Sequence, residues 1–148
     1  MRKTRVYLDN CCYNRPFDDQ IAITIRLETD AKLYIQEIIK LGQLELIWSF
    51  VLDYENNDNP FDDAREQIAL WRNLAVMDCD PTDKITDKAE ELMKLGLRQK
   101  DASHLACAIA CQADFFITTD KKILNKKLPD IQVIDPINFV RSFIYAER

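Results

Sequence analysis

Apolar residues recur at helical spacing in two segments, each of which stops at a glycine. One segment precedes Gly42 and the other precedes Gly96. Glycine directly after such a segment is typical of a helix end, because it adopts the left-handed backbone conformation at low cost. The pattern therefore predicts a helix before each glycine. The apolar positions are Leu27, Ala31, Tyr34, Ile35, Ile38 and Leu41 in the first, and Ile85, Ala89, Leu92 and Met93 in the second.

Short apolar runs of strand length alternate with these helical segments. They lack strict polar alternation, which is typical of parallel strands covered on both faces. The sequence therefore predicts an α/β fold: a three-layer sandwich with a central parallel sheet of four to five strands flanked by helices, in a single domain over 1–148. The runs are RVYLD (5–9), LELIWS (44–49), DFFIT (114–118) and IQVID (131–135), with VMDCD (76–80) a strand or a loop; further helices fit 50–57, 63–75, 101–113, 121–127 and 137–146.

Composition and charge restrict the function classes. Hydrophobic residues make up 47% and charged residues 30% of the 148 residues, as in ordinary globular proteins. No apolar stretch approaches the roughly 18 to 20 residues that cross a bilayer, so we expect a cytoplasmic protein with no membrane partner and five reduced cysteines. The net charge of −5 argues against broad neutralisation of nucleic-acid phosphates. Any nucleic-acid role must therefore be local, through a small basic patch or bound cations.

Four carboxylates occupy positions that a parallel sheet brings to one edge. Asp9 and Asp120 follow predicted strands, Glu55 lies six residues after Ser49, and Asp101 opens the helix predicted at 101–113. Ligands bind at the carboxyl ends of parallel strands. Carboxylates gathered there repel one another unless a cation intervenes, and oxygen ligands without imidazole or thiolate favour Mg²⁺ or Mn²⁺.

Each of these acids also has a purely structural alternative. Asp101 and Asp120 sit where helix N-caps are expected, and Asp9 could form a turn. Glu55, taken alone, could be an ordinary surface residue. His104 falls on one face of the 101–113 segment together with Cys107 and Cys111, but three ligands on one helix cannot all reach one zinc ion. We therefore interpret that face as core packing.

The sequence resembles PIN-domain ribonucleases, especially the VapC-like toxins of toxin–antitoxin pairs. The motifs that carry the resemblance span the chain: VYLDNCCYNRP with Asp9, SFVLDYE with Ser49 and Glu55, KDASHLACAIACQADFFITTD with Asp101 and Asp120, and the closing IQVID. The family likeness implies a PIN-like fold and an endoribonuclease that depends on Mg²⁺ or Mn²⁺ and leaves a 5′-phosphate and a 3′-hydroxyl.

The resemblance also implies roles for individual residues and partners. It implies an RNA substrate, a possible antitoxin and a homodimer. We expect Asp9, Glu55, Asp101 and Asp120 to form the catalytic metal site, Asn10, Ser49, Thr118 and Thr119 to support it, and Arg15, Lys100, Lys121 and Lys122 to contact substrate.

One departure from the family pattern leaves a second interpretation open. Many VapC toxins carry another Asp two residues after the last site Asp, where this chain has Lys122. The alternative is therefore a catalytically inactive PIN-like module that binds protein. A phospho-acceptor domain of the receiver type is poorly supported, because LDNCC offers a single acid where that type needs an adjacent pair.

Overall fold

A five-stranded parallel sheet forms the centre of the molecule. The computed structural model describes residues 2–146. Along the sheet the strands follow the order β3-β2-β1-β4-β5, so the first strand is central. Three residues of β1, Val6, Tyr7 and Leu8, are fully buried. The strands are β1 (Arg5–Leu8), β2 (Glu45–Ser49), β3 (Met77–Cys79), β4 (Phe115–Ile117) and β5 (Gln132–Ile134).

Parallel pairing brings all carboxyl ends of the strands to one edge. Val6 pairs with Leu46 of β2 and with Phe115 of β4, and the outer pairs are parallel as well. The segments that leave β1, β2 and β4 therefore begin next to one another. The helices are α1 (Asn10–Asn14), α2 (Ile23–Lys40), α3 (Phe50–Asn57), α4 (Asp62–Ala69), α5 (Asp83–Met93), α6 (Gln99–Ala110), α7 (Lys121–Leu124) and α8 (Pro136–Ala146), with 3₁₀ turns η1 (Arg15–Phe17) and η2 (Leu70–Leu74).

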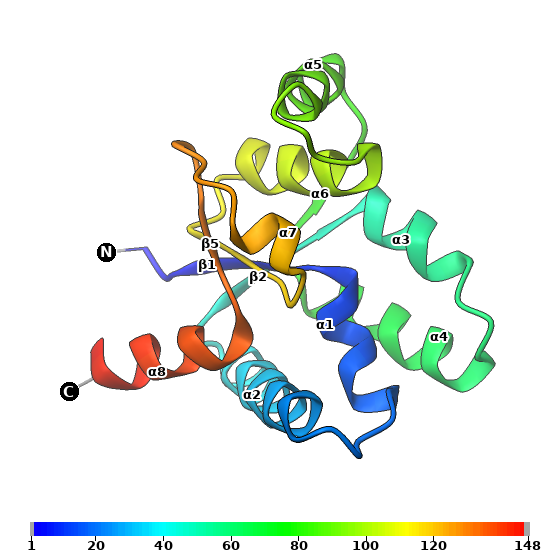
Figure 1. The fold of residues 1–148 in the computed structure, drawn as a ribbon, viewed down its shortest axis with the longest axis vertical. Helices are drawn as coiled ribbons and strands as arrows, with labels where there is room; N and C mark the ends of the chain where they lie inside the picture. Colours follow the sequence, from blue (N-terminus) through cyan, green and yellow to red (C-terminus); the bar gives the residue numbers. More distant parts are fainter. Residues whose placement is uncertain (1, 147–148) are drawn as a thin grey trace.

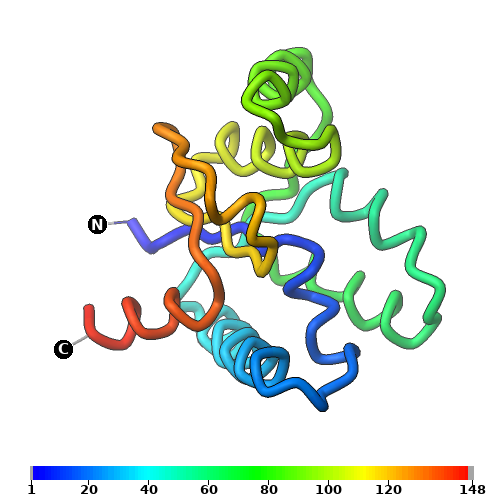
Figure 2. The backbone as a smooth tube through the Cα atoms, in the orientation of Figure 1, coloured from blue at the N-terminus to red at the C-terminus, as the bar shows by residue number. Residues whose placement is uncertain are grey.

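Helices cover both faces of the sheet and complete the predicted three layers. Helices α5 and α6 lie on one face, while α2 and α8 lie on the other (Figure 1). Helix α3 extends beyond the carboxyl edge, on the side away from the two ends of the traced chain (Figure 2). The predicted α/β class and layered architecture are thus confirmed, with five strands.

The helix ends predicted at the two glycines are confirmed, whereas other element boundaries differ from the expectations. Gly42 and Gly96 follow α2 and α5 with φ of 76° and 93°. The ambiguous 76–80 segment forms an edge strand. Helix α6 begins at Gln99 and ends at Ala110, so Asp101 lies inside its first turn and the N-cap alternative for Asp101 is wrong. The short α1 after Asp9 was not predicted.

All five cysteines are free. Within residues 2–146, none of the helices combines the length and the apolar character that a bilayer crossing requires.

Candidate acidic site at the carboxyl edge of the sheet

Asp9 is held in place by both of its carboxylate oxygens. It caps α1, where the Asn10 backbone N–H donates to Oδ1 at 2.8 Å. The Thr118 hydroxyl, from the segment after β4, donates to Oδ2 at 2.7 Å. Because the two contacts come from neighbouring strand ends, the carboxylate of Asp9 is oriented by rigid elements rather than by a mobile loop.

Glu55 on α3 is the end point of a buried hydrogen-bond chain. His104 Nε2 lies 2.6 Å from Glu55 Oε1, His104 Nδ1 lies 2.6 Å from the Tyr7 hydroxyl, and that hydroxyl lies 2.6 Å from Ser49 Oγ. The Leu52 backbone N–H donates to Ser49 Oγ at 3.3 Å. These hydrogen bonds connect Ser49, the N-cap of α3, to the Glu55 carboxylate through the interior of the protein.

The donors in this chain can all point the same way. A carboxylate only accepts, so Nε2–H donates to Glu55 and a neutral ring presents Nδ1 as an acceptor. Burial raises the pKa of Tyr7 well above its usual value, so the phenol keeps its proton and donates to Nδ1. The Ser49 hydroxyl then donates to the Tyr7 oxygen. Every buried polar group in the chain is satisfied in this arrangement.

His104 belongs to the acidic cluster as well as to the core. Its side chain is 1% exposed, as core packing predicts. However, Nε2 also lies 3.9 Å from Asp9 Oδ1, and ligand atoms of Asp9, Glu55 and His104 all lie within 4.8 Å of one another. The expected oxygen-only set without imidazole is therefore incomplete. The spacing of His104 three residues after Asp101 was a usable signal, since both lie on the same side of α6.

Asp101 and Asp120 face one another across an arginine. Arg98 Nε lies 3.3 Å from Asp101 Oδ2, and its Nη2 lies 3.5 Å from Asp120 Oδ2. Asp120 also caps α7, accepting from the Lys122 backbone N–H at 2.9 Å, so the capping interpretation of Asp120 is confirmed. Arg98 was not among the residues expected at the site. Four acids from four separate segments thus approach one edge of the sheet.

The pKa values of two of the acids report how closely these charges interact. Burial raises the pKa of Asp101, the Asp9 charge raises it further, and Arg98 opposes both without cancelling them. Burial also acts to raise the pKa of Glu55, but the hydrogen bond from His104, with Lys100 and Asn10, brings it below the usual value. Glu55 is therefore stabilised as a carboxylate, whereas the charged form of Asp101 is destabilised by burial and by the nearby Asp9 charge.

This donor set fits a divalent cation. The ligand atoms of Asp9 and Glu55 are hard oxygens. Burial first, and then repulsion from Asp9, raises the pKa of Asp101, and a cation at this position would offset the repulsion. Carboxylates suit Mg²⁺ and Mn²⁺, whereas imidazole also suits softer metals. Asp9 and Glu55 provide the best oriented oxygens.

The expected supporting residues have defined positions. Ser49 caps α3 and ends the His104 chain, and Thr118 positions Asp9 and accepts from the Asp120 backbone N–H at 3.1 Å. The Asn10 side chain contributes to the lowered pKa of Glu55. Thr119 turns away from the acids, since its hydroxyl accepts from Arg15 at 3.1 Å.

The four expected substrate cations differ in availability. Arg15 pairs with Asp18 at 2.7 Å and Glu28 at 2.9 Å, which braces η1 against α2. Lys100, Lys121 and Lys122 are exposed, and Lys100 lies close enough to lower the pKa of Glu55. The three lysines therefore remain free to approach a ligand at the acidic edge.

Comparison with solved structures places the fold. No family model matches the sequence, and no curated protein matches it either. VapBC2 from Rickettsia felis, bound to a DNA fragment from its promoter, is similar with 16% identity over 89% of this chain and 98% of that chain, at a TM-score of 0.57. FitAcB from Neisseria gonorrhoeae is 11% identical over 88% and 97%, at 0.56. VapBC-1 from nontypeable Haemophilus influenzae is 19% identical over 90% and 98%, at 0.55.

These likenesses extend over nearly the full length of each compared chain. At such identities they concern the fold, and they agree with the family to which the sequence motifs pointed. The chain has a VapC-like PIN fold.

Proposed function

We propose that this protein is an endoribonuclease that depends on a divalent metal ion and acts as the toxin of a toxin–antitoxin pair. The close approach of Asp9 and Glu55 at the carboxyl edge of the sheet carries this proposal, with Asp101 near enough to Asp9 for their charges to interact and Asp120 joined to Asp101 through Arg98. The VapC-like fold supports it. The products would carry a 5′-phosphate and a 3′-hydroxyl, as the family resemblance implies.

The four acids divide the work of holding Mg²⁺ or Mn²⁺. Asp9 and Asp101 would hold the ion directly, while Glu55 and Asp120 would complete or orient its shell. A divalent ion held there would supply Lewis acidity toward water and the phosphodiester. Thr118 fixes the rotamer of Asp9 through its 2.7 Å hydrogen bond, so that this ligand is already in place before the ion arrives.

His104 orients Glu55 in this scheme. Its Nε2–H donates to Glu55 Oε1, which fixes the orientation of the carboxylate in which it would serve the ion. Tyr7 fixes the tautomer through Nδ1. The His104 ring therefore positions Glu55, and its contact with the buried Tyr7 determines which ring nitrogen carries the proton.

RNA binding in this proposal is local. The net charge of −5 gives no broad attraction for phosphates, so Lys100, Lys121 and Lys122 around the acidic edge contact the substrate together with the ion. Because this chain is similar in fold to VapBC proteins, we propose that it binds an antitoxin and forms a homodimer. We propose a cytoplasmic location on the basis of the same likeness.

Cleavage of a mixed RNA pool with Mn²⁺ tests the activity. We expect the wild type to cleave and Asp9→Asn and Asp101→Asn to lose at least about a hundredfold in rate, because each removes a charged ligand. Asp63→Asn, an exposed acid on α4, is the matched control and should cleave like the wild type. Equal cleavage by all four proteins would assign the activity to a contaminant.

Arg98 favours a second candidate function, a metal-free binding module. Its guanidinium lies within 3.5 Å of both Asp101 and Asp120 and supplies part of the counter-charge that a cation would otherwise bring. Calorimetric titration with Mn²⁺ separates the two functions. Binding that Asp9→Asn abolishes supports the nuclease, whereas no binding to the folded wild type supports the module.

A further inference from the structure

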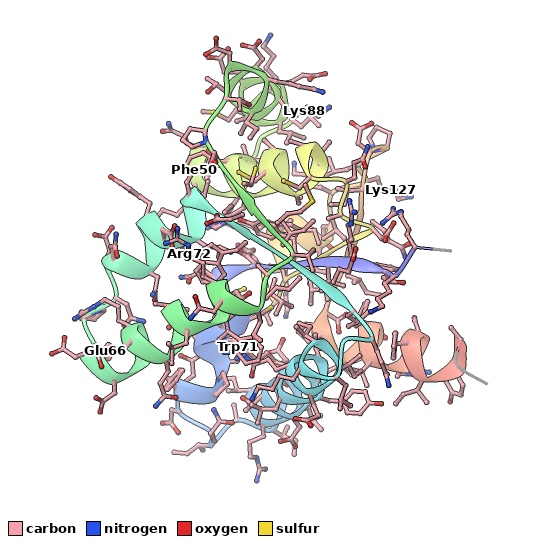
Figure 3. All side chains as sticks on the ribbon, turned by 180° about the vertical axis from the view of Figure 1, so that it is seen from behind. Phe50, Glu66, Trp71, Arg72, Lys88 and Lys127 are labelled. Atoms are coloured by element: carbon pink, nitrogen blue, oxygen red, sulfur yellow. The ribbon has the colours of Figure 1, made fainter. Side chains whose placement is uncertain are left out.

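A cavity with a largely apolar lining lies away from the acidic edge, between α2 and the α4–η2 segment. Its volume is about 470 Å³, and no residue of the acidic cluster lines it. Trp71 of η2 lines this cavity, and Figure 3 shows it beside α2. The α2 side contributes Lys32, Gln36 and Lys40, while Ile68 and Leu70 add apolar surface on the opposite side.

Lys32 is buried here without a carboxylate. Its side chain is 3% exposed, and Nζ lies 5.5 Å from the centre of the Tyr13 ring and 5.6 Å from that of Trp71. Among residues 2–146, no acid forms an ion pair with it. Glu28, one turn earlier on α2, is paired with Arg15. Aromatic faces replace only part of the hydration that a buried ammonium group loses.

The neighbouring polar groups on α2 are donors as well. Gln36, one turn after Lys32, is 5% exposed, and its buried Nε2 has no hydrogen-bond partner within the described part of the chain. Lys40, a further turn along, places Nζ 5.4 Å from the Trp71 ring centre. Burial, with repulsion from Lys40, lowers the pKa of Lys32 to about 7. Lys32 and Gln36 thus place buried donors on one wall of the cavity, and the exposed Lys40 adds a positive charge at its end.

We propose that this cavity binds a carboxylate carried on an apolar body. The acid accepts hydrogen bonds from Lys32 and Gln36, with Lys40 adding charge, while the apolar part lies against Trp71, Ile68 and Leu70. A carboxylate matches the site better than a phosphate dianion does. It carries one charge and needs fewer donors, and the apolar wall offers nothing to replace the tighter hydration of phosphate. This inference does not depend on the proposed nuclease activity.

Binding of small acids, followed by Trp71 fluorescence in a Trp48→Phe background, tests the proposal. The probes are hydrocinnamate, its neutral amide, and N-acetyl-glutamyl-leucine amide, which presents the same group on a peptide. We expect saturable millimolar binding of at least one acid and none of the hydrocinnamide. Binding of hydrocinnamate alone identifies a small-molecule site, and binding of the dipeptide alone identifies a site for an acidic peptide.

Matched variants distinguish the cavity from unspecific binding. Lys32→Met keeps the length of the side chain and should weaken the acid about tenfold or more, because a charge-assisted hydrogen bond is lost. Lys94→Met, at the exposed lysine that directly follows α5, should bind like the parent protein. Circular dichroism and thermal unfolding establish that both variants are folded. Absence of saturable binding by either acid, equal binding of the amide, or an unchanged Lys32→Met would each overturn the proposal.

Discussion

Replacing Lys32 by methionine should stabilise the protein at neutral pH and change how its stability depends on pH. The ammonium group is buried between Tyr13 and Trp71 and has no acid partner in the described chain, whereas methionine fills similar space without a charge. Part of the gain is offset because the cation–π contacts are lost. The variant therefore measures what burial of this single charge costs the fold.

The size of the effect follows from the pKa of Lys32. That pKa falls from 10.5 to about 7 on folding. At about 1.4 kcal/mol per unit, the charged form costs the fold about 5 kcal/mol. Between pH 7 and pH 10.5 the unfolded chain keeps this proton and the folded chain does not. The free energy of unfolding of the wild type should therefore rise with pH across this window, and the cost is fully present below it.

Urea unfolding from about pH 6 to about pH 9, with the cysteines kept reduced, provides the measurement. The advantage of Lys32→Met should be constant below pH 7 and should shrink by about 3 kcal/mol between pH 7 and pH 9. Lys94→Met removes an exposed positive charge and should follow the wild-type profile. Parallel profiles for the wild type and Lys32→Met across the whole range would refute the reasoning.

Three further predictions concern the acidic edge and the core. Arg98→Gln should tighten Mn²⁺ binding about two- to fivefold at low ionic strength, since the exposed guanidinium no longer repels the ion; weaker binding by calorimetry would contradict this. Glu55→Gln should lose less stability on acidification than the wild type, because the lowered pKa of Glu55 contributes stability that disappears as pH falls through it; identical acid-unfolding curves would argue against the His104 contact. Leu46→Ala should cost about 2 to 5 kcal/mol in urea unfolding, and a loss below 1 kcal/mol would be incompatible with its burial in the sheet.

The sequence predicted best those helices and strands whose residue pattern is periodic or whose ends depend on a single local residue. Helical spacing before Gly42 and Gly96 predicted α2 and α5, since glycine at positive φ ends both. Apolar runs predicted the inner strands because both faces of those strands are buried. The edge strand β3 stayed ambiguous, since Met77 and Asp78 are exposed and the run reads as a loop.

The site was predictable in outline but not in its connections. Parallel topology alone places Asp9, Glu55 and Asp120 at one edge, which required no knowledge of side-chain packing. The contacts of His104 with Glu55 and Tyr7 join residues 49 and 97 positions apart, and nothing in a local pattern encodes them. A local pattern does not predict the contact of Arg98 with Asp101 either, because that contact depends on how far α6 extends before Asp101.

The acids at the carboxyl edge are contributed by segments that are synthesised at very different times. Asp9 is made early, but its Thr118 contact and its neighbour Asp120 arrive only after β4 has been translated and inserted beside β1. A nascent chain that stops short of β4 lacks Thr118 and Asp120, and therefore lacks a complete site. The acidic site can therefore be completed only after most of the chain has been translated.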